Sequence, residues 1–247
     1  MFRNLKIIIL VLVAGLMVGC AAVPQQPIQM NQSVFSSKTS RVGIVMAKLP
    51  KVDTEFPGAG CLLCYAAASA ANSSLTAHTK TLPYDDLPKI KADIADLIRK
   101  KGNEVTVIDE DIELKELPSY SKKNEKTAPT DFSSITRKYN LDKLIVLNIQ
   151  TLGFIRPYSS YFPVGEPYAV FNGVGYMVNS SDNNYDWYLP VTINKHSDRK
   201  WDEAPNFPGL SNAYFQALEL GRDQFLKPFK EENLGSVPQA STTKNAG

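Results

Sequence analysis

The stretch KLIVLNIQTL, at Lys143–Leu152, has the clearest strand pattern in the sequence. Its side chains are mostly aliphatic or β-branched, which is typical of a strand buried inside a sheet. Two shorter runs of the same kind precede it, RVGIVMAK at Arg41–Lys48 and EVTVI at Glu104–Ile108. We therefore expect these three segments to form buried strands.

Two further strands are predicted at Tyr168–Asn179 and Tyr185–Lys195, with the polar residues Ser180–Asn184 as the turn between them. Residues 84–101 predict an amphipathic helix closed by Gly102, because apolar residues recur there at helical spacing. The same kind of recurrence predicts a final helix. Its positions are Leu210, Tyr214, Ala217, Leu218, Gly221 and Phe225.

The remaining segments are shorter or more polar. Residues 61–77 are small and apolar and predict a tightly packed helix or turn, whereas 49–60 and 118–130 predict loops. Asp131 can cap a short helix. The order β, α, α, β, α, β, β, β, α predicts an α/β (α+β) fold, with helices packed on a single mixed sheet. Its early strands would be parallel and its C-terminal strands an antiparallel meander.

The composition is that of an ordinary globular protein. The chain has 247 residues, of which 43% are hydrophobic and 21% charged, with a formal net charge of +2. These values exclude a disordered chain, a collagen-like repeat and a polytopic membrane protein. The near balance of charge provides no basic field for nucleic acid.

The N-terminus has the pattern of an export signal. Arg3 and Lys6 precede the apolar run Ile7–Val18, which is shorter than the about 20 residues needed to span a bilayer. The following residues, LMVGCA, resemble a bacterial lipobox. That resemblance implies that residues 1–19 are a signal peptide and that Cys20 becomes diacylated and N-terminal. By analogy with enterobacterial lipoprotein sorting, the Ala21 that follows the cysteine, in place of an aspartate, implies sorting to the outer membrane.

The mature chain divides into three parts by composition. Residues 20–40 are rich in Gln, Ser, Pro and Asn and predict a flexible tether from the lipidated cysteine. Residues 41–229 are long enough for one α/β domain with its own core. Residues 230–247 have no apolar period and predict a disordered tail.

The order of elements over 41–229 resembles the α/β domain of the curli-secretion channel lipoprotein and the amino-terminal domain of TolB. The sequence pattern of residues 143–205 also resembles that of a group of poorly characterised outer-membrane lipoproteins. That second likeness implies family membership and carries no catalytic residues. The shared features are Leu152-Gly153, Tyr161-Phe162-Pro163-Val164-Gly165, Gly173-Val174-Gly175 and Trp201–Pro205.

Cys61 and Cys64 form a C-x-x-C pair, and export would place them where paired cysteines usually oxidise. Three interpretations are open: a structural disulfide, which we favour, a redox-active pair, and two buried free thiols. A redox pair needs a helix N-terminus or a cation to stabilise its thiolate. No Lys, Arg or His lies between residues 55 and 70.

Catalytic and metal motifs are absent from the sequence. A Ser-His-Asp triad would use His78 or His196, but both lie among polar residues, and we expect them to be solvated. There is no G-x-S-x-G, P-loop or G-x-G-x-x-G motif. Two isolated histidines and no second cysteine pair provide no zinc site. We therefore expect no enzyme activity, no metal and no cofactor.

Residues 154–178 are unusually rich in aromatic side chains and proline. Aromatic residues at this density are typical of a recognition surface, and the alternative is a long hairpin loop whose rings fold back on the sheet. The predicted partner-binding residues are Tyr158, Tyr161, Phe162 and Tyr168. Trp187 and Trp201 are expected to pack in the core or at its edge.

These features predict a periplasm-facing lipoprotein of the bacterial outer membrane, anchored to the membrane through its N-terminal lipid. Its role would be non-enzymatic, in envelope assembly or maintenance, through contacts with other envelope proteins. The alternatives are a subunit of an oligomeric secretion or export apparatus, as the curli-channel resemblance implies, and a periplasmic thiol-disulfide oxidoreductase that uses Cys61 and Cys64.

Overall fold

The computed structural model describes residues 24–37, 39–122 and 124–230 of the chain. The main sheet contains β1 (Arg41–Met46), β2 (Asp53–Glu55), β3 (Glu104–Val107), β4 (Lys143–Ile155), β7 (Tyr168–Asn179) and β8 (Tyr185–His196). Its strand order is β3-β1-β4-β7-β8, and β2 pairs with β4. β1 pairs in parallel with β3 and β4, whereas β4, β7 and β8 pair antiparallel. The predicted fold class is therefore confirmed.

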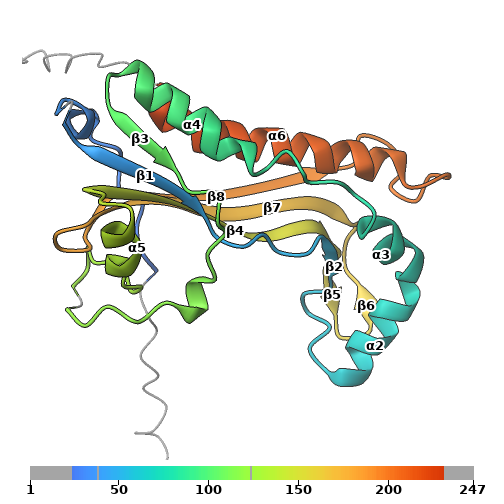
Figure 1. The fold of residues 1–247 in the computed structure, drawn as a ribbon. Coiled ribbons are helices and arrows are strands. Elements are labelled where there is room, and N and C mark those ends of the chain that lie inside the picture. The colour runs from blue at the N-terminus through green and yellow to red at the C-terminus, as the bar shows by residue number, and fades with distance from the viewer. Residues whose placement is uncertain (1–23, 38, 123, 231–247) are drawn as a thin grey trace, which may run out of the picture.

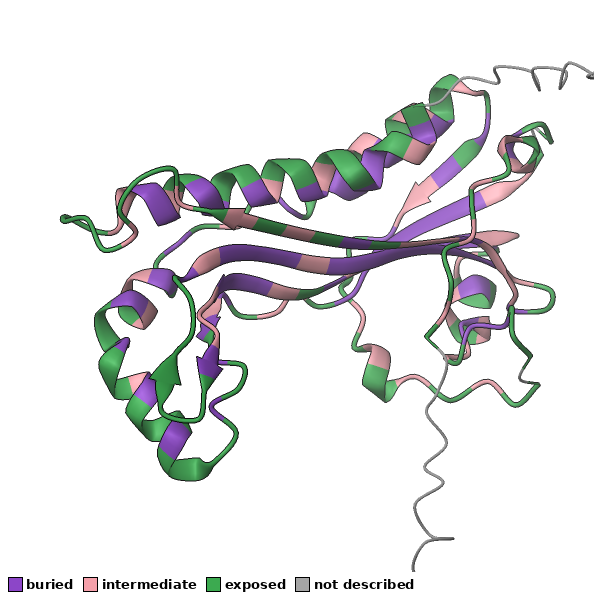
Figure 2. Ribbon diagram, turned by 180° about the vertical axis from the view of Figure 1, so that it is seen from behind, coloured by how far each residue is buried: buried purple, intermediate pink, exposed green. Residues whose placement is uncertain are grey.

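β4 lies in the middle of the sheet and is buried on both faces (Figure 2). Ile145 and Leu147 belong to one hydrophobic cluster, whereas Leu144 and Val146 belong to another. These clusters lie on opposite faces, because successive side chains of a strand point in opposite directions. Burial on both faces explains why KLIVLNIQTL is continuously apolar rather than alternating.

Two long helices, α4 (Lys89–Lys100) and α6 (Pro208–Lys230), cover one face of the sheet (Figure 1). The apolar stripe of α4 is fully buried against that face. α4 begins at Lys89 rather than at residue 84, because residues 84–88 form a turn that ends in Pro88 at the N-cap. Gly102 follows the helix with a φ of 90°, a conformation that glycine adopts at low cost.

The opposite face is covered by α5 (Ser133–Lys138) and the segment before it, which includes the 3-10 turn η2 (Leu114–Glu116). The segment 118–130 was expected to be an exposed loop, and this is only partly correct. Ala128 is buried, and its carbonyl accepts a hydrogen bond of 3.0 Å from the Asn183 side chain. The loop is therefore tied to the β7–β8 turn.

A small lobe projects from the far end of the sheet, on the side away from α4 and α6 (Figure 1). It consists of α2 (Leu62–Ala71), α3 (Ser73–Thr79), β5 (Tyr158–Ser159) and β6 (Phe162–Pro163). The segment 49–60, expected as a loop, contains β2 and leads into the lobe. Gly153 has a φ of 128°, and a Cβ there would lie 2.0 Å from the Asp53 carbonyl oxygen. Glycine is thus what lets β2 approach β4.

The segment expected as a free tether is largely part of the domain, which corrects that prediction. Ile28 forms a β-bridge with Tyr188, and the 3-10 turn η1 (Gln32–Phe35) buries Phe35 in the core under α6. The Asn103 side chain donates a hydrogen bond of 2.9 Å to the Phe35 carbonyl. The signal peptide 1–19, Cys20 and the tail from 231 lie outside the described residues and remain predictions.

Among the described residues, no helix has the length and the apolar character needed to cross a bilayer.

Candidate contact surfaces

The lobe has a small hydrophobic core of its own, separate from the two main clusters. The ring of Phe56 meets the ring of Tyr158 edge to face, with centroids 5.8 Å apart. Cys64 and Ala68 contribute the buried face of α2 to the same cluster. A cluster of this size is enough to hold α2 against the β5–β6 hairpin, but it leaves most of α2 exposed.

Cys61 and Cys64 form a disulfide across the first turn of α2, with Cα atoms 4.9 Å apart. Cys61 is the N-cap of the helix, and its Sγ accepts a hydrogen bond of 2.9 Å from the Cys64 amide. Cys64 is buried, whereas Cys61 is exposed. The bond closes the start of α2 and leaves one of its sulfurs accessible to solvent.

Tyr158 was predicted as a contact residue, and the structure contradicts this. Its side chain is buried, and its hydroxyl accepts a hydrogen bond of 2.7 Å from Asn72 Nδ2. Arg156 donates to the side-chain oxygen of the same asparagine. Tyr158 therefore supports the lobe from inside, because its ring fills the lobe core and its hydroxyl is already occupied.

The other predicted contact residues separate into two groups. Tyr161 lies in the turn between β5 and β6, and Phe162 begins β6. Both side chains are exposed, and Tyr161 Oη lies 3.7 Å from Cys61 Sγ. Tyr168 is half-buried and packs on the His196 ring, with centroids 5.1 Å apart. The structure thus brings Tyr161 and Phe162 next to the disulfide and keeps Tyr168 on the main sheet.

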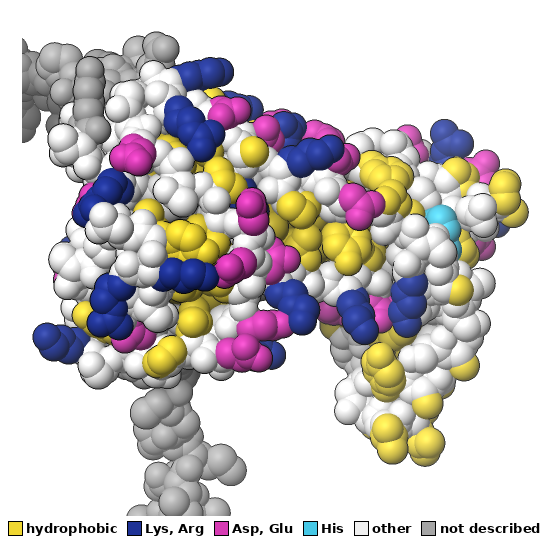
Figure 3. All heavy atoms as spheres, in the orientation of Figure 1, with side chains coloured by type: hydrophobic (Ala, Val, Ile, Leu, Met, Phe, Trp, Pro, Cys, Tyr) yellow, Lys and Arg dark blue, Asp and Glu magenta, His cyan; other side chains and the backbone are white. Residues whose placement is uncertain are grey.

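The exposed apolar side chains of the lobe form one surface, which we call the lobe tip. Leu62 is 85% exposed and Phe162 is 72% exposed, values that are unusual for large apolar residues. Figure 3 shows hydrophobic side chains gathered at the free end of the lobe. The lobe tip consists of Leu62, Leu63, Tyr65, Tyr161, Phe162 and Val164.

Sequence reasoning missed the contribution of α2 to this surface. Its residues, LLCYAAASAA, are apolar on every side, and such a helix is normally buried. The available signal was charge: no Asp, Glu, Lys or Arg occurs between Glu55 and Lys80, nor between Arg156 and Glu166. Both segments of the lobe are therefore uncharged, and together they produce an apolar surface facing solvent.

Trp201 connects the lobe to the rest of the domain. Its ring stacks on Phe207, with centroids 6.3 Å apart, and the Arg156 guanidinium lies 4.7 Å from its ring centroid. A guanidinium over an aromatic face is an attractive cation–π contact. Trp201 is half-buried, and Trp187 is fully buried against α6, as expected for edge and core residues.

His78 was predicted to be solvated, and the structure corrects this. Its Nε2 lies 2.7 Å from Ser211 Oγ, and its ring packs on Phe207. Ser211 Oγ also donates to the Asn206 carbonyl, which assigns the Nε2 proton to His78 as the donor. This polarity is the reverse of a catalytic Ser-His pair, and the contact instead joins α3 to the start of α6. Burial lowers the pKa of His78 below its ordinary value of 6.5.

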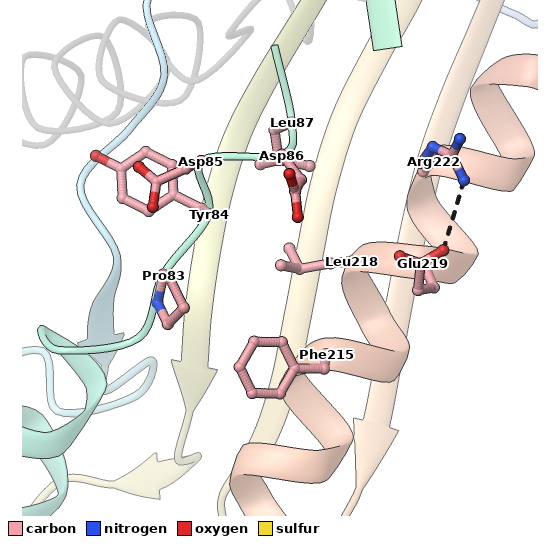
Figure 4. Close-up of a pocket in the computed structure, with 9 residues that line it drawn as sticks. All are labelled: Pro83, Tyr84, Asp85, Asp86, Leu87, Phe215, Leu218, Glu219 and Arg222. Carbon is pink, nitrogen blue, oxygen red and sulfur yellow. Dashed lines mark ion pairs between the residues drawn. The ribbon is translucent and has the colours of Figure 1, made fainter. Parts of the chain in front are cut away.

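A groove lies between the segment before α4 and the exposed side of α6, with a cavity volume of about 150 Å³. In Figure 4 the side chains of Phe215 and Leu218 project from α6 towards this segment. Tyr214 Oη donates a hydrogen bond of 3.2 Å to the Pro83 carbonyl and fixes the segment against the helix. We call this the α6 groove; it is lined by Pro83, Tyr84, Asp85, Asp86, Leu87, Phe215, Leu218, Glu219 and Arg222.

The rim of the α6 groove is mainly acidic. The lining includes the three carboxylates of Asp85, Asp86 and Glu219 and one guanidinium, that of Arg222, which pairs with Asp93 at 2.9 Å and with Glu219 at 3.7 Å. The hydrogen bond from Lys89 lowers the pKa of the Asp86 carboxyl, which keeps it ionised. The groove therefore presents an apolar floor and a negative rim.

Metal-binding clusters of three or more His, Cys, Asp or Glu side chains are not found in the described part of the chain. Asp85 and Asp86 lie on the rim of the α6 groove, where they contribute negative charge.

No known family matches the sequence, and no curated protein is similar to it. Several solved structures show a distant likeness, and three of them are the following. The PelC dodecamer from Paraburkholderia phytofirmans is 10% identical, with a TM-score of 0.33 over 84% of this chain and 96% of that chain. Protein XCC0632 from Xanthomonas campestris is 12% identical, with a TM-score of 0.35 over 83% and 85%.

The third structure, lipoprotein GNA1162 from Neisseria meningitidis, is 9% identical, with a TM-score of 0.30 over 73% of this chain and 96% of that chain. At these identities and TM-scores, none of the three carries family membership or function to this chain. One of the three is a lipoprotein by name. The expected likeness to the curli-secretion channel lipoprotein and to TolB has no support in these three matches.

Proposed function

We propose that this protein is a periplasm-facing lipoprotein of the outer membrane, with a non-enzymatic role in envelope assembly or maintenance through protein contacts. The lipobox-like LMVGCA supplies the anchor at Cys20. The α6 groove is the observation that carries the protein-contact role. It combines apolar floor residues with an acidic rim on a face that no other described element covers.

The chemistry of the groove selects its partner. An apolar side chain that enters between Phe215 and Leu218 removes apolar surface from water, which is the main source of binding free energy. A lysine or arginine beside it would meet Asp85 and Asp86, and such charge complementarity adds specificity and association rate. The proposed occupant is thus a segment of another envelope protein with apolar and basic side chains.

The anchor is tested by the mass of the mature protein purified from membranes. The expected result is a chain that begins at Cys20 and carries acyl groups, and Cys20→Ala should abolish both processing and membrane attachment. A mature chain without lipid would overturn the anchored role.

The groove is tested by in-cell photocrosslinking from a benzoylphenylalanine placed at Phe215. A discrete crosslink to one envelope protein is expected, and Glu219→Lys should weaken it because the change reverses a rim charge. Glu125→Lys, an exposed change on the α5 side of the sheet, is the matched control. Loss of the crosslink in both variants, or in neither, would contradict the groove as the contact site.

A second candidate, a thiol-disulfide oxidoreductase, is favoured by the position of Cys61 at the N-terminus of α2. The helix dipole lowers the pKa of a thiol at this position. A substrate thiolate would attack Cys61 Sγ, the Cys61–Cys64 bond would break, and Cys64 would leave as a thiolate. A second substrate thiolate would then release Cys61, so that the substrate dithiol is oxidised and the pair reduced.

This candidate is tested by oxidation of a reduced dithiol peptide by the full mature chain. Cys61→Ser should abolish the reaction, and equal rates with both cysteines replaced would dismiss the oxidoreductase role. Native mass spectrometry of the detergent-solubilised protein tests the secretion-apparatus alternative, because only that role requires a closed ring of identical subunits.

A further inference from the structure

The lobe tip is a large apolar surface without charge. Six large side chains from α2 and the β5–β6 hairpin are exposed together, and Leu63 is 70% and Val164 63% exposed. A contiguous exposed apolar surface on a folded domain marks a contact with a protein, a ligand or a membrane. The absence of Asp, Glu, Lys and Arg from both lobe segments removes the charged groups that would resist entry into lipid.

The surface is held rigidly rather than on a loose loop. The disulfide closes the first turn of α2, which contains Leu62 and Leu63. Two backbone hydrogen bonds tie the hairpin to the loop before α2: Tyr158 N–H to the Pro57 carbonyl at 2.8 Å, and Ser160 N–H to the Gly58 carbonyl at 3.0 Å. Little conformational entropy therefore remains to be lost when the lobe tip binds.

The start of the described chain indicates which side of the domain faces the membrane. Figures 1 and 2 show the described chain beginning on the side of the sheet on which α5 and the lobe lie. Residues 27–30 then pass the edge strand β8 and reach α6, where they line a pocket with Gln224 and Pro228. Three residues separate Cys20 from Pro24, so the two Cα atoms are four steps of the chain apart and at most about 14 Å from each other. A lipid on Cys20 would hold the domain with its lobe side towards the bilayer.

We propose that the lobe tip inserts its apolar side chains into the membrane as a second contact beside the lipid on Cys20; this rests on the anchored role proposed above. Leu62, Leu63 and Phe162 would enter the acyl region. The hydroxyls of Tyr65 and Tyr161 would remain at headgroup level, where amphipathic aromatic rings are favoured. Two points of attachment fix the orientation of the domain, so that the α6 groove faces the periplasm.

The depth of the lobe tip is measured by tryptophan quenching with the lipidated full mature chain in phosphatidylethanolamine and phosphatidylglycerol vesicles. The vesicles carry bromine on the lipid acyl chains. Phe162→Trp should show quenching beyond that of the parent chain, which contains Trp187 and Trp201. Phe215→Trp, the same change on the opposite side of the domain, should show none. Equal quenching in the two variants, or no added quenching in Phe162→Trp, would overturn the proposal. The lobe tip would then be interpreted as a contact surface for a protein.

The contribution of the lobe tip without the anchor is measured by flotation of the Cys20→Ser full mature chain with the same vesicles. Leu63→Asp should lower the vesicle-bound fraction about tenfold, because one leucine side chain can no longer enter the acyl region. Aspartate in the first turn of a helix is compatible with the helix dipole, so α2 should still form. Leu220→Asp on α6 is the control and should leave binding unchanged.

The two proposals fail in different ways. If the mass of the mature protein shows no lipid while Cys20→Ser protein still floats and Leu63→Asp does not, the anchor is wrong and the lobe-tip contact stands. If the mature protein carries the lipid, and the Cys20→Ser chain floats equally well with and without Leu63→Asp, the lobe-tip contact is wrong and the anchor stands.

Discussion

Tyr158 Oη lies 2.7 Å from Asn72 Nδ2, at the point where α2 ends and α3 begins. The same Asn72 Nδ2 also donates to the Ala68 carbonyl at 2.7 Å, so one buried amide links both helices to the β5–β6 hairpin. The two segments of the lobe are distant in sequence and meet through this contact. A contact surface built on them depends on a residue that is not part of the surface.

Tyr158→Phe should destabilise the lobe by about 1–3 kcal/mol, because it leaves a buried amide donor with one partner fewer. Hydrogen exchange of the α2 and α3 amides measures this locally. Tyr161→Phe is the matched control, since its hydroxyl lies on the exposed surface and should have little effect. Equal protection in the two variants would show that the Asn72 contact contributes nothing.

Gly153→Ala should destabilise the domain by about 3 kcal/mol, because the residue has a φ of 128° and faces the Asp53 backbone. Urea denaturation of the full mature chain measures the change. Gly60→Ala introduces the same methyl group where no atom lies within 4 Å and should be nearly neutral. A neutral Gly153→Ala would contradict the described pairing of β2 with β4.

Reduction of the Cys61–Cys64 disulfide should lower the free energy of unfolding by about 2 kcal/mol, because the closed loop is short. The double variant Cys61→Ser, Cys64→Ala should have its free energy of unfolding lowered by the same amount, since serine can still cap α2. Cys61→Ala with Cys64→Ala also loses the cap and should be less stable by about 1 kcal/mol more. Equal stability of the two double variants would exclude a capping role for residue 61.

Stability should decrease at acidic pH through His78. The folded pKa is lowered by burial, so below the ordinary value of 6.5 the unfolded chain binds a proton that the folded chain does not. The native state therefore loses stability as the pH falls from about 7 to values below 6.5. His78→Gln should reduce this slope in urea denaturation curves measured across that range. An unchanged slope would show that His78 titrates alike in both states.

Local patterns were sufficient for the longer strands of the main sheet but not for β2. Strand segments such as Lys143–Leu152 and Tyr168–Asn179 are found where the sequence predicted them. A strand that is buried along its length consists mainly of apolar residues, and this can be recognised in the sequence. The amphipathic stripe of α4 is equally local, as is the stop at Gly102. The start of α4 was predicted five residues too early, at residue 84 instead of Lys89. Apolar spacing does not distinguish the turn that ends in Pro88 from a first turn of helix.

Exposure was not predictable in the same way. Leu62 and Tyr158 are both large and apolar in character, and only the packing of the lobe makes the first exposed and the second buried. His78 and the segment around Phe35 looked polar or unpatterned, yet both are fixed by partners distant in the sequence. Such contacts produce no periodic pattern in the sequence, because the partner of each residue is determined by the tertiary fold and not by the residues next to it in the chain.

By itself, the sequence determined the order of the long strands and helices, the mixed sheet, and the lipobox-like signal at Cys20, because hydrophobic periodicity and short motifs are local properties of the chain. Only the tertiary structure decided that α2 and the β5–β6 hairpin meet in one uncharged lobe, that Tyr158 supports this lobe from within, and that a groove opens beside Phe215 on the other side. These depend on contacts between residues far apart in the chain, whose geometry is fixed only when the sheet brings them together.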